Sequence, residues 1–262
     1  MTELHFVTIA TNIYIDYFRN LVASMYKEIP NAANMHLHVF TNEVEKAFEI
    51  SSEYPSLSIK INEISNLTWP EATLWRYRYI SMVASSSQGV VAYLDADMLI
   101  NADIREEMIN ISGHDQMVFV EHPGFWRPKG KERISFYLLH PTYLLRDLLS
   151  YLVLGGIGAW ETDRKSVAYV PRKKRRQYLC GGFWFADAKI SASFCSQQME
   201  SVEIDTKNKV TAKWHDESHL NEWASRNKYR FFSPQYCFSE SALNLSSLQP
   251  LVIAVEKNVR TR

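Results

Sequence analysis

The sequence predicts an α/β domain with a largely parallel central sheet. Short β-rich apolar runs alternate with segments of helical periodicity along the first 122 residues, which is typical of parallel strands connected by helices. The chain has 262 residues, of which 46% are apolar and 22% charged. This length and composition suit one globular domain with its own core, so we expect a single domain over residues 1–262.

The expected elements follow from the apolar patterns in chain order. Strands are expected at residues 4–11, 36–41, 57–64, 89–100 and 116–122. Helices are expected at 13–26 and at 71–85, the second with Pro70 at its start. Further on, the expected elements are an apolar helix at 141–156, a glycine-led strand at 180–188 and a helix at 189–205. Ligands of such sheets bind beyond the carboxyl ends of the strands, so residues 11–14, 95–97 and His122 are candidate site residues.

Charge, cysteine content and the N-terminus exclude several classes. The 29 basic and 29 acidic side chains cancel, so no global field favours nucleic acid or a membrane. Three cysteines form neither a CxxC pair nor a disulfide framework. The first 18 residues contain no basic n-region and no long apolar run, so neither a signal peptide nor a membrane span is predicted. We expect a soluble cytoplasmic protein that binds no nucleic acid.

The segment "YLDADML" places Asp95 and Asp97 two residues apart at the end of an apolar run. Where a strand ends the chain turns, so both carboxylates can reach one ion. Hard divalent cations such as Mn²⁺ or Mg²⁺ prefer oxygen ligands and share their coordination with phosphate. The motif therefore indicates a metal site that would neutralise a diphosphate leaving group. The alternative is an ordinary polar turn after a strand.

The segment "WHDESHLNEW" at 214–223 resembles a zinc-binding helix. His215 and His219 are four residues apart and share a helix face, but Asp216 stands where the H-E-x-x-H motif requires glutamate. No third ligand is evident. The acids also suit the first turn of a helix. A third interpretation is an acidic pair, Asp216 and Glu217, facing a sugar pocket with Trp214 as an apolar platform.

Two basic segments and a pair of glycines are further candidates. "RKKRR" at 172–176 is either a solvated loop or a phosphate-binding patch, and the terminal "EKNVRTR" allows the same two interpretations. "CGG" at 180–182 would let a ligand approach the backbone closely, or would form a turn.

Taken together, these stretches resemble glycosyltransferase family 6. The segments "HLHVFTN", "YLDADM", "HPGFW", "AYVP" followed by "GGFWF", "WHDESHLNEW…FFSPQYC" and "VEKNVR" occur in the family's order. The resemblance implies the nucleotide-sugar transferase fold of the D-x-D type, which is Rossmann-like with flanking helices. A donor-binding half at about 1–120 would precede an acceptor-binding half at about 121–262. It implies retaining transfer of galactose or N-acetylgalactosamine from a UDP-sugar to a glycan acceptor in α-1,3 linkage, with Mn²⁺ or Mg²⁺.

The resemblance also implies roles for individual residues. Glu217 would be catalytic, as nucleophile or charge stabiliser near the anomeric carbon. Donor-binding residues would be Ala10, Thr11, Tyr14, Arg76, Asp95, Asp97, Cys180, Gly181, Gly182, Asp216, Lys257 and Arg260. Acceptor-binding residues would be His122, Trp214 and Glu217. Asp95 and Asp97 would hold the metal, and the tail and the 172–176 segment would be mobile lids.

Some features depart from the family pattern. Vertebrate members carry a membrane anchor, which this chain does not show, so we expect a soluble bacterial or viral member with an intact D-x-D motif. "RKKRRQY" replaces an acidic, aromatic segment before the glycines. Gly182 leaves room for an N-acetyl group, which favours N-acetylgalactosamine, although glucose-type donors stay open. Alternatives are a zinc hydrolase using His215 and His219, and a non-catalytic nucleotide-sugar binding protein.

Overall fold

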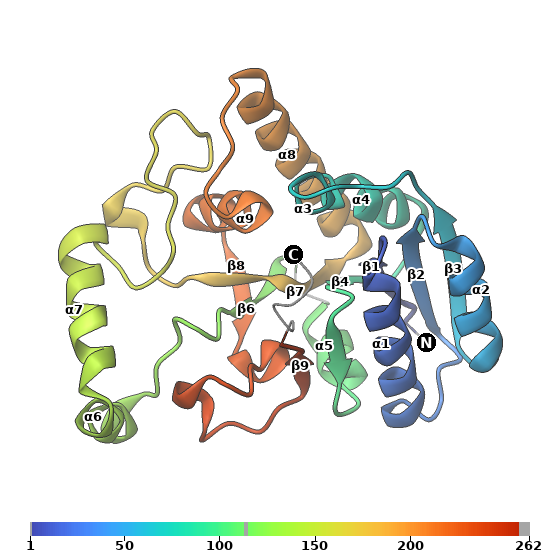
Figure 1. The fold of residues 1–262 in the computed structure, drawn as a ribbon, viewed down its shortest axis with the longest axis horizontal. Coiled ribbons are helices and arrows are strands. Elements are labelled where there is room, and N and C mark those ends of the chain that lie inside the picture. The colour runs from blue at the N-terminus through green and yellow to red at the C-terminus, as the bar shows by residue number, and fades with distance from the viewer. Residues whose placement is uncertain (1, 113–114, 257–262) are drawn as a thin grey trace.

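A seven-stranded sheet runs through the middle of the molecule (Figure 1). The structure, a computed structural model, describes residues 2–112 and 115–256. The strands lie in the order β3-β2-β1-β4-β7-β6-β8. Their bounds are β1 Leu4–Ile9, β2 Met35–Thr41, β3 Ser58–Glu63, β4 Val90–Leu94, β6 Met117–Glu121, β7 Leu179–Asp187 and β8 Tyr229–Phe232. All run in one direction except β7, which is antiparallel to both neighbours. The predicted α/β fold is confirmed.

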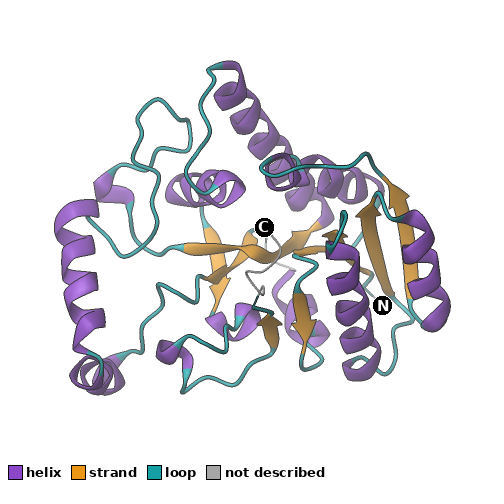
Figure 2. Cartoon of the chain, in the orientation of Figure 1, coloured by secondary structure: helices purple, strands orange, loops and turns teal. Residues whose placement is uncertain are grey.

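Helices cover both faces of the sheet (Figure 2). The helices α1 (Tyr14–Glu28), α2 (Val44–Glu53) and α5 (Arg105–Ser112) share one apolar cluster with alternate residues of β1, β4 and β7. The helices α4 (Arg76–Ser86), α8 (Ala188–Lys207) and α9 (His215–Arg226) share the cluster on the other face. In β4, Leu94 faces the first cluster and Tyr93 the second. Successive strand residues face opposite sides, so burial on both faces explains the unbroken apolar run.

Two expected elements are divided in the structure. The strand predicted at 89–100 was wrong in extent, because β4 ends at Leu94 and a new strand, β5 (Met98–Ile100), begins after the acidic turn. β5 pairs with β9 (Val252–Ala254) in a separate two-stranded sheet. The helix predicted at 71–85 is also two helices, α3 (Glu71–Leu74) and α4, with Trp75 between them at φ −90° and ψ 2°. That conformation lies outside the helical region.

The segment between β6 and β7 forms the end of the molecule farthest from β3 (Figure 1). It contains α6 (Gly130–Leu139), α7 (Pro141–Leu154) and the short 3₁₀ helix η1 (Arg172–Lys174). The apolar helix predicted at 141–156 is confirmed, and it ends at Gly155 with φ 75°, a left-handed conformation that favours glycine. Two further 3₁₀ helices, η2 (Pro234–Cys237) and η3 (Leu243–Leu245), precede β9.

No helix within the described ranges combines the length and apolar character needed to cross a membrane. The expected cytoplasmic location stays a prediction, as does the division into donor-binding and acceptor-binding halves near residue 120.

Candidate functional site

A cleft of about 440 Å³ lies at the carboxyl ends of β1 and β4. The chain leaves β1 for β2 on one side, while β4 lies on its other side. The strand order therefore reverses here, and such switch points are the usual ligand sites of open α/β sheets. The structure brings Thr11, Tyr14, Asp95 and Asp97 to the lining of this cleft, together with Trp69. Ala10, the residue before Thr11, is fully buried beneath it.

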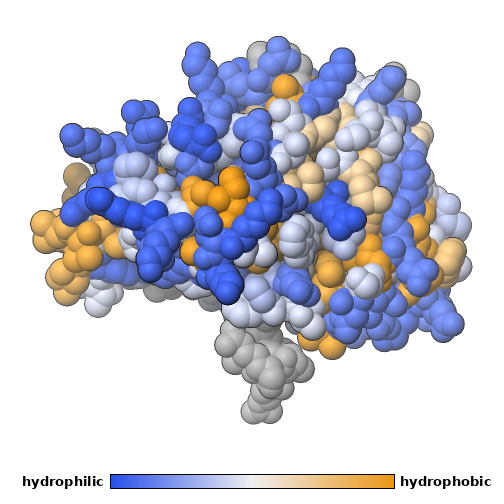
Figure 3. All heavy atoms as spheres, turned by 90° about the horizontal axis from the view of Figure 1, so that it is seen from above, coloured by the Kyte–Doolittle hydropathy of each residue, from blue (hydrophilic) through white to orange (hydrophobic). Residues whose placement is uncertain are grey.

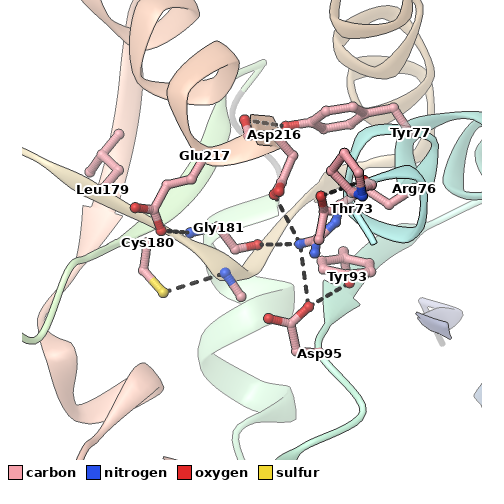
Figure 4. Close-up of polar contacts among 12 residues, drawn as sticks. Thr73, Arg76, Tyr77, Tyr93, Asp95, Leu179, Cys180, Gly181, Asp216 and Glu217 are labelled. Carbon is pink, nitrogen blue, oxygen red and sulfur yellow. Dashed lines mark hydrogen bonds and ion pairs between the residues drawn. The ribbon is translucent and has the colours of Figure 1, made fainter. Parts of the chain in front are cut away.

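Arg76, at the start of α4, joins the two acidic motifs (Figure 4). One guanidinium nitrogen, Nη1, lies 3.3 Å from Asp95 Oδ1 and 3.1 Å from Asp216 Oδ2. The same nitrogen donates to the carbonyl oxygen of Gly181 at 3.3 Å. The guanidinium also lies over the Tyr93 ring, 4.7 Å from its centre. Because Arg76 is only 7% exposed, it is a fixed positive charge between segments far apart in sequence.

The carboxylate of Asp95 has one engaged and one open oxygen. Its Oδ1 accepts a hydrogen bond from the Tyr93 hydroxyl at 2.6 Å and also faces Arg76. Its Oδ2 accepts no hydrogen bond from any residue that the structure describes. Asp97 is 8% exposed and lines the cleft, and its backbone carbonyl accepts from the N–H of Val255 at 2.9 Å. The acidic turn is thereby tied to the chain after β9.

Asp95 and Asp97 fit a divalent cation by the type of donor they offer. Carboxylate oxygens are the preferred ligands of Mn²⁺ and Mg²⁺, and Asp95 Oδ2 is open to accept one. Within residues 2–112 and 115–256, no group of three His, Cys, Asp or Glu side chains is arranged to hold a metal. Two carboxylates would therefore need further oxygen ligands, such as phosphate oxygens. Metal dependence stays a prediction.

Asp216 and Glu217 lie in the first turn of α9 and face β7 (Figure 4). Glu217 Oε2 accepts a hydrogen bond from the backbone N–H of Gly181 at 3.0 Å. The Tyr77 hydroxyl donates to the carbonyl oxygen of Asp216 at 3.0 Å, which fixes the helix start against α4. Asp216 thus meets Arg76, and Glu217 meets Gly181.

Burial raises the pKa values of both acids. The pKa of Asp216 is raised to about 7, because desolvation outweighs the opposing effect of Arg76. The pKa of Glu217 is also raised to about 7 by desolvation, against the hydrogen bonds from Gly181 and Tyr178. The Arg76–Asp216 contact alone would lower the carboxyl pKa, but the loss of water is the larger effect for a group this buried. Raised carboxyl pKa values at a cleft are typical of functional sites.

His122, which follows β6, lies beside Glu217. Its Nε2 is 3.9 Å from Glu217 Oε1, which is longer than a hydrogen bond. Burial lowers the pKa of His122 to about 4, so the ring is neutral at neutral pH and no ion pair forms. The backbone N–H of Gly124 donates to Nδ1 at 3.1 Å, so the proton of the neutral ring is on Nε2, facing the glutamate. Phe125 and Tyr178 enclose the ring.

The glycines of β7 leave room for this arrangement. A Cβ atom on Gly181 would lie 3.0 Å from Asp216 Oδ2, and one on Gly182 would lie 3.0 Å from Asp95 Oδ2 and 2.5 Å from Met98 Cε. Larger residues at either position would fill the space beside the two carboxylates. Cys180 lies on the same side of the strand as Gly182, whose Cβ would be 3.6 Å from its sulfur, and that sulfur is 3.0 Å from the sulfur of Cys237, with both thiols free. Gly181 thus lies against Asp216, and Gly182 lies against Asp95.

Other predicted residues lie apart from this cluster. Trp214 is 48% exposed, and its backbone N–H donates to Ser218 Oγ at 3.0 Å. Lys257 and Arg260 lie outside the described residues. In the 172–176 segment, Arg172 and Arg175 donate to backbone carbonyls at the end of α7, which gives both side chains a structural contact. The proposed lid function stays a prediction.

The two histidines of the zinc hypothesis have other neighbours. His219 Nε2 lies 3.5 Å from Asp205 Oδ2 on α8, and burial lowers the pKa of His219 to about 4. The His215 ring packs edge-on against Trp69, with ring centres 4.6 Å apart. Among the described residues, neither histidine belongs to a group of three side chains that could hold a metal ion.

Sequence reasoning missed three residues that complete the site. Tyr93 precedes Asp95 by two positions and so shares its strand face, a signal present in "YLDADM". Asn221 binds both the N–H and the carbonyl oxygen of Leu179 at 2.9 Å, fixing α9 against β7. Tyr178 contacts Glu217. Neither Asn221 nor Tyr178 stands in a pattern that would have distinguished it from an ordinary core residue.

The mostly parallel sheet, its flanking helices and the acidic cleft are consistent with a glycosyltransferase fold. The family model described as Glycosyltransferase family 6 matches residues 154–261. These residues include the glycines of β7 and the acids of α9. Together with the relatives described next, this match shows that the chain is similar to members of glycosyltransferase family 6 and supports a glycosyltransferase.

Curated relatives include two kinds of transferase. Histo-blood group ABO system transferase 1 of Rattus norvegicus is 28% identical over 198 residues, which are 72% of this chain and 48% of the relative. Histo-blood group ABO system transferase 2 of the same organism is 26% identical over 198 residues, 72% of this chain and 50% of the relative. O-antigen biosynthesis glycosyltransferase WbnI of Escherichia coli is 24% identical over 237 residues, 88% of this chain and 86% of the relative. The chain spans about half the length of the two rat relatives.

Proposed function

We propose that the protein is a retaining glycosyltransferase. It would move galactose or N-acetylgalactosamine from a UDP-sugar to a sugar hydroxyl in α-1,3 linkage, with Mn²⁺ or Mg²⁺. The observation that carries this proposal is the Arg76 guanidinium, which contacts both Asp95 and Asp216. It brings the candidate metal-binding motif and the candidate reacting carboxylates to one place. The family match and the transferase relatives support the same reaction class.

The donor nucleotide is proposed to occupy the cleft between β1 and β4. Tyr14 would stack on the base, beside the backbone of Ala10 and Thr11. The cleft volume of about 440 Å³ is within the usual range of small-molecule sites. The diphosphate would lie toward Asp95 and Asp97, where a bound divalent cation would neutralise the negative charge that develops on the departing UDP.

Glu217 is the proposed catalytic residue. Retention requires either a covalent glycosyl-enzyme or attack from the same face through an oxocarbenium-like state, and a carboxylate near the anomeric carbon serves both. In the first route Glu217 forms a bond to that carbon as the bond to the diphosphate oxygen breaks. In the second it stabilises the positive charge. Both need the ionised form, which the Gly181 N–H stabilises by its hydrogen bond to Oε2.

Asp216 and the glycines are proposed to position the donor sugar. Arg76 holds the Asp216 carboxylate at 3.1 Å, so its orientation is set before a sugar hydroxyl arrives. The absence of a side chain at Gly182 favours a donor with an N-acetyl group, although the flexible end of Met98, 2.5 Å from where a Cβ would lie, must then shift. This is the basis for preferring N-acetylgalactosamine over galactose.

The acceptor is proposed to approach from the side of His122. A second cavity of about 230 Å³ lies there, and Phe125, Trp126 and Tyr178 are part of its lining. Aromatic faces suit the apolar faces of sugar rings. With its proton on Nε2, His122 can donate to an acceptor oxygen that lies beside Glu217. Trp214 is a further proposed acceptor contact.

A panel of UDP-sugars tests the proposal. UDP release is followed with and without glycan acceptors, with Mn²⁺ or chelator, and the anomeric configuration of any product is read by NMR. We expect UDP-N-acetylgalactosamine or UDP-galactose to react and the product to be α-linked. Inverted product, or turnover confined to other donors, would contradict the proposal. Binding of UDP-sugars with neither transfer nor hydrolysis would instead favour a nucleotide-sugar binding protein.

Two variants test the residue assignments. Glu217→Gln should reduce transfer at least ~100-fold while UDP still binds, and Asp97→Asn should remove Mn²⁺-supported turnover while the fold persists. The matched control is Glu203→Gln on α8, a carboxyl group that is 52% exposed. Tightly bound stoichiometric zinc in the purified protein, lost on replacement of His215 and His219, would favour the zinc hydrolase.

A further inference from the structure

The surface of α6 and α7 is unusually apolar. Ten of the nineteen large hydrophobic side chains that are exposed among the described residues lie on these two helices. Six of them define what we call the α6–α7 apolar surface, with exposures from 52% to 78%: Leu138, Leu139, Leu145, Leu148, Leu152 and Val153. Figure 3 shows apolar residues gathered at the edge of the molecule where Figure 1 places α6 and α7, with hydrophilic side chains beside them.

The helix α7 has the opposite polarity to an ordinary surface helix, with polar side chains toward the protein and apolar side chains toward solvent. Its core-facing side carries Asp147, which is 3% exposed and receives two hydrogen bonds from Arg127 at 2.6 and 2.7 Å. Ser150 on the same side donates to the carbonyl oxygen of Gly156 at 2.7 Å. Surface helices of globular proteins normally bury their apolar face and expose the polar one. The buried ion pair therefore fixes α7 with its leucines outward.

A concentration of positive charge accompanies this surface. Residues 129–176 contain eleven of the 29 Lys and Arg residues but four of the 29 Asp and Glu residues. The segment thus has a net charge of +7 in a chain whose net charge is zero. Arg146 on α7 is exposed, as are Lys173 and Lys174 on η1. Arg172 donates to the carbonyl oxygen of Leu152 at 2.7 Å, which places the basic η1 directly against the end of α7.

We infer that the α6–α7 apolar surface and its basic border bind the surface of an anionic lipid bilayer. Apolar helix faces flanked by Lys and Arg lie in the membrane interface, where apolar burial and attraction to anionic headgroups add together. The same features argue against a symmetric dimer of this chain. An isologous interface pairs one surface with itself, so it would bring two segments of net charge +7 together.

The surface lies beside the candidate acceptor cavity. Tyr151 of α7 and Arg133 of α6 line the same cavity as Tyr178, the residue that contacts Glu217. A glycan carried by a lipid in the bilayer would reach Glu217 from this side. That last step rests on the proposed function, whereas binding to the bilayer does not.

Vesicle flotation with the full chain tests the inference without any substrate. Vesicles of phosphatidylcholine alone are compared with vesicles containing about one third phosphatidylglycerol. We expect at least ~10-fold stronger binding to the anionic vesicles, since each basic side chain near such a surface adds to the attraction. Raising the salt concentration should weaken binding, because it screens exposed charges.

Matched variants separate the two contributions. Leu148→Ser/Leu152→Ser should reduce binding about 10-fold or more, and Lys173→Glu/Lys174→Glu should do the same. The controls, Phe48→Ser/Met82→Ser and Lys27→Glu/Lys46→Glu, change exposed side chains elsewhere and should bind like the unaltered chain.

Three results would overturn the inference: no binding of the unaltered chain to anionic vesicles, equal loss in variants and controls, or a dimer in solution that Leu148→Ser/Leu152→Ser dissociates without any vesicle binding. UDP release by the same variants with a soluble acceptor is a separate measurement. Activity without vesicle binding would refute this inference alone, and vesicle binding without activity would refute the proposed function alone.

Discussion

Replacing Glu217 by glutamine should change how the stability of the protein depends on pH. Glutamine keeps the size of the side chain and an oxygen that can accept from the Gly181 N–H, but it cannot ionise. Burial raises the pKa of Glu217 from 4.5 to about 7 in the folded protein. The folded state therefore holds this proton at pH values where the unfolded chain has lost it, so the stability of the unaltered protein falls as pH rises through this window.

The size of the effect follows from the two pKa values. A tenfold difference in proton affinity corresponds to about 1.4 kcal/mol, so a carboxyl pKa raised from 4.5 to about 7 corresponds to ~3 kcal/mol above the folded pKa. Part of this is already present near pH 5. We therefore expect the advantage of Glu217→Gln over the unaltered protein to grow by about 2 kcal/mol between about pH 5 and about pH 8.

Urea unfolding at several pH values in this range measures the difference. Taking the difference between two proteins cancels the titration of groups that they share, such as the buried His122 and His219. The m-values should agree, because the surface exposed on unfolding is the same. Glu203→Gln, at an exposed carboxyl, should give a curve parallel to that of the unaltered protein. A parallel curve for Glu217→Gln as well would refute the reasoning that burial holds its proton.

Three further predictions follow from the same site. Arg76→Met should destabilise the fold by roughly 3–5 kcal/mol near pH 8, because Asp95 and Asp216 lose their shared cation. This loss of stability should shrink toward pH 6 as Asp216 is protonated, and an equal loss at both pH values would contradict the prediction. Gly182→Ala should weaken the binding of UDP with Mn²⁺ about 10-fold by crowding Asp95. Calorimetry measures this affinity, and an unchanged value would show that UDP and the metal do not use the space beside Gly182. The kcat/KM for transfer should rise with pH and level off above about 7, as ionisation of Glu217 requires, and a flat profile between about pH 5 and pH 8 would exclude its titration from the rate.

The sequence by itself determined the class of fold and the segments that meet at the site. Alternating apolar strands and helices required an α/β sheet, and the acidic residues after the strand at 90–94 had to lie at its carboxyl edge. The segments "YLDADM", "CGG" and "WHDESH" could be chosen in advance because carboxylates and glycines at strand and helix ends are seldom needed for packing. The sequence did not reveal that the predicted 89–100 strand is divided: β4 ends at Leu94 and β5 begins at Met98, on either side of the acidic turn.

Only the tertiary structure decided how these segments act on one another. The ion pairs of Arg76 with Asp95 and Asp216 join positions 19 and 140 residues apart, and no local pattern encodes such separations. The raised pKa values of Asp216 and Glu217 depend on burial, which follows from packing rather than from residue type. The orientation of α7 also depends on tertiary structure. Its sequence predicts an apolar helix but not which face is buried, and the buried Arg127–Asp147 pair decides that the leucines face outward.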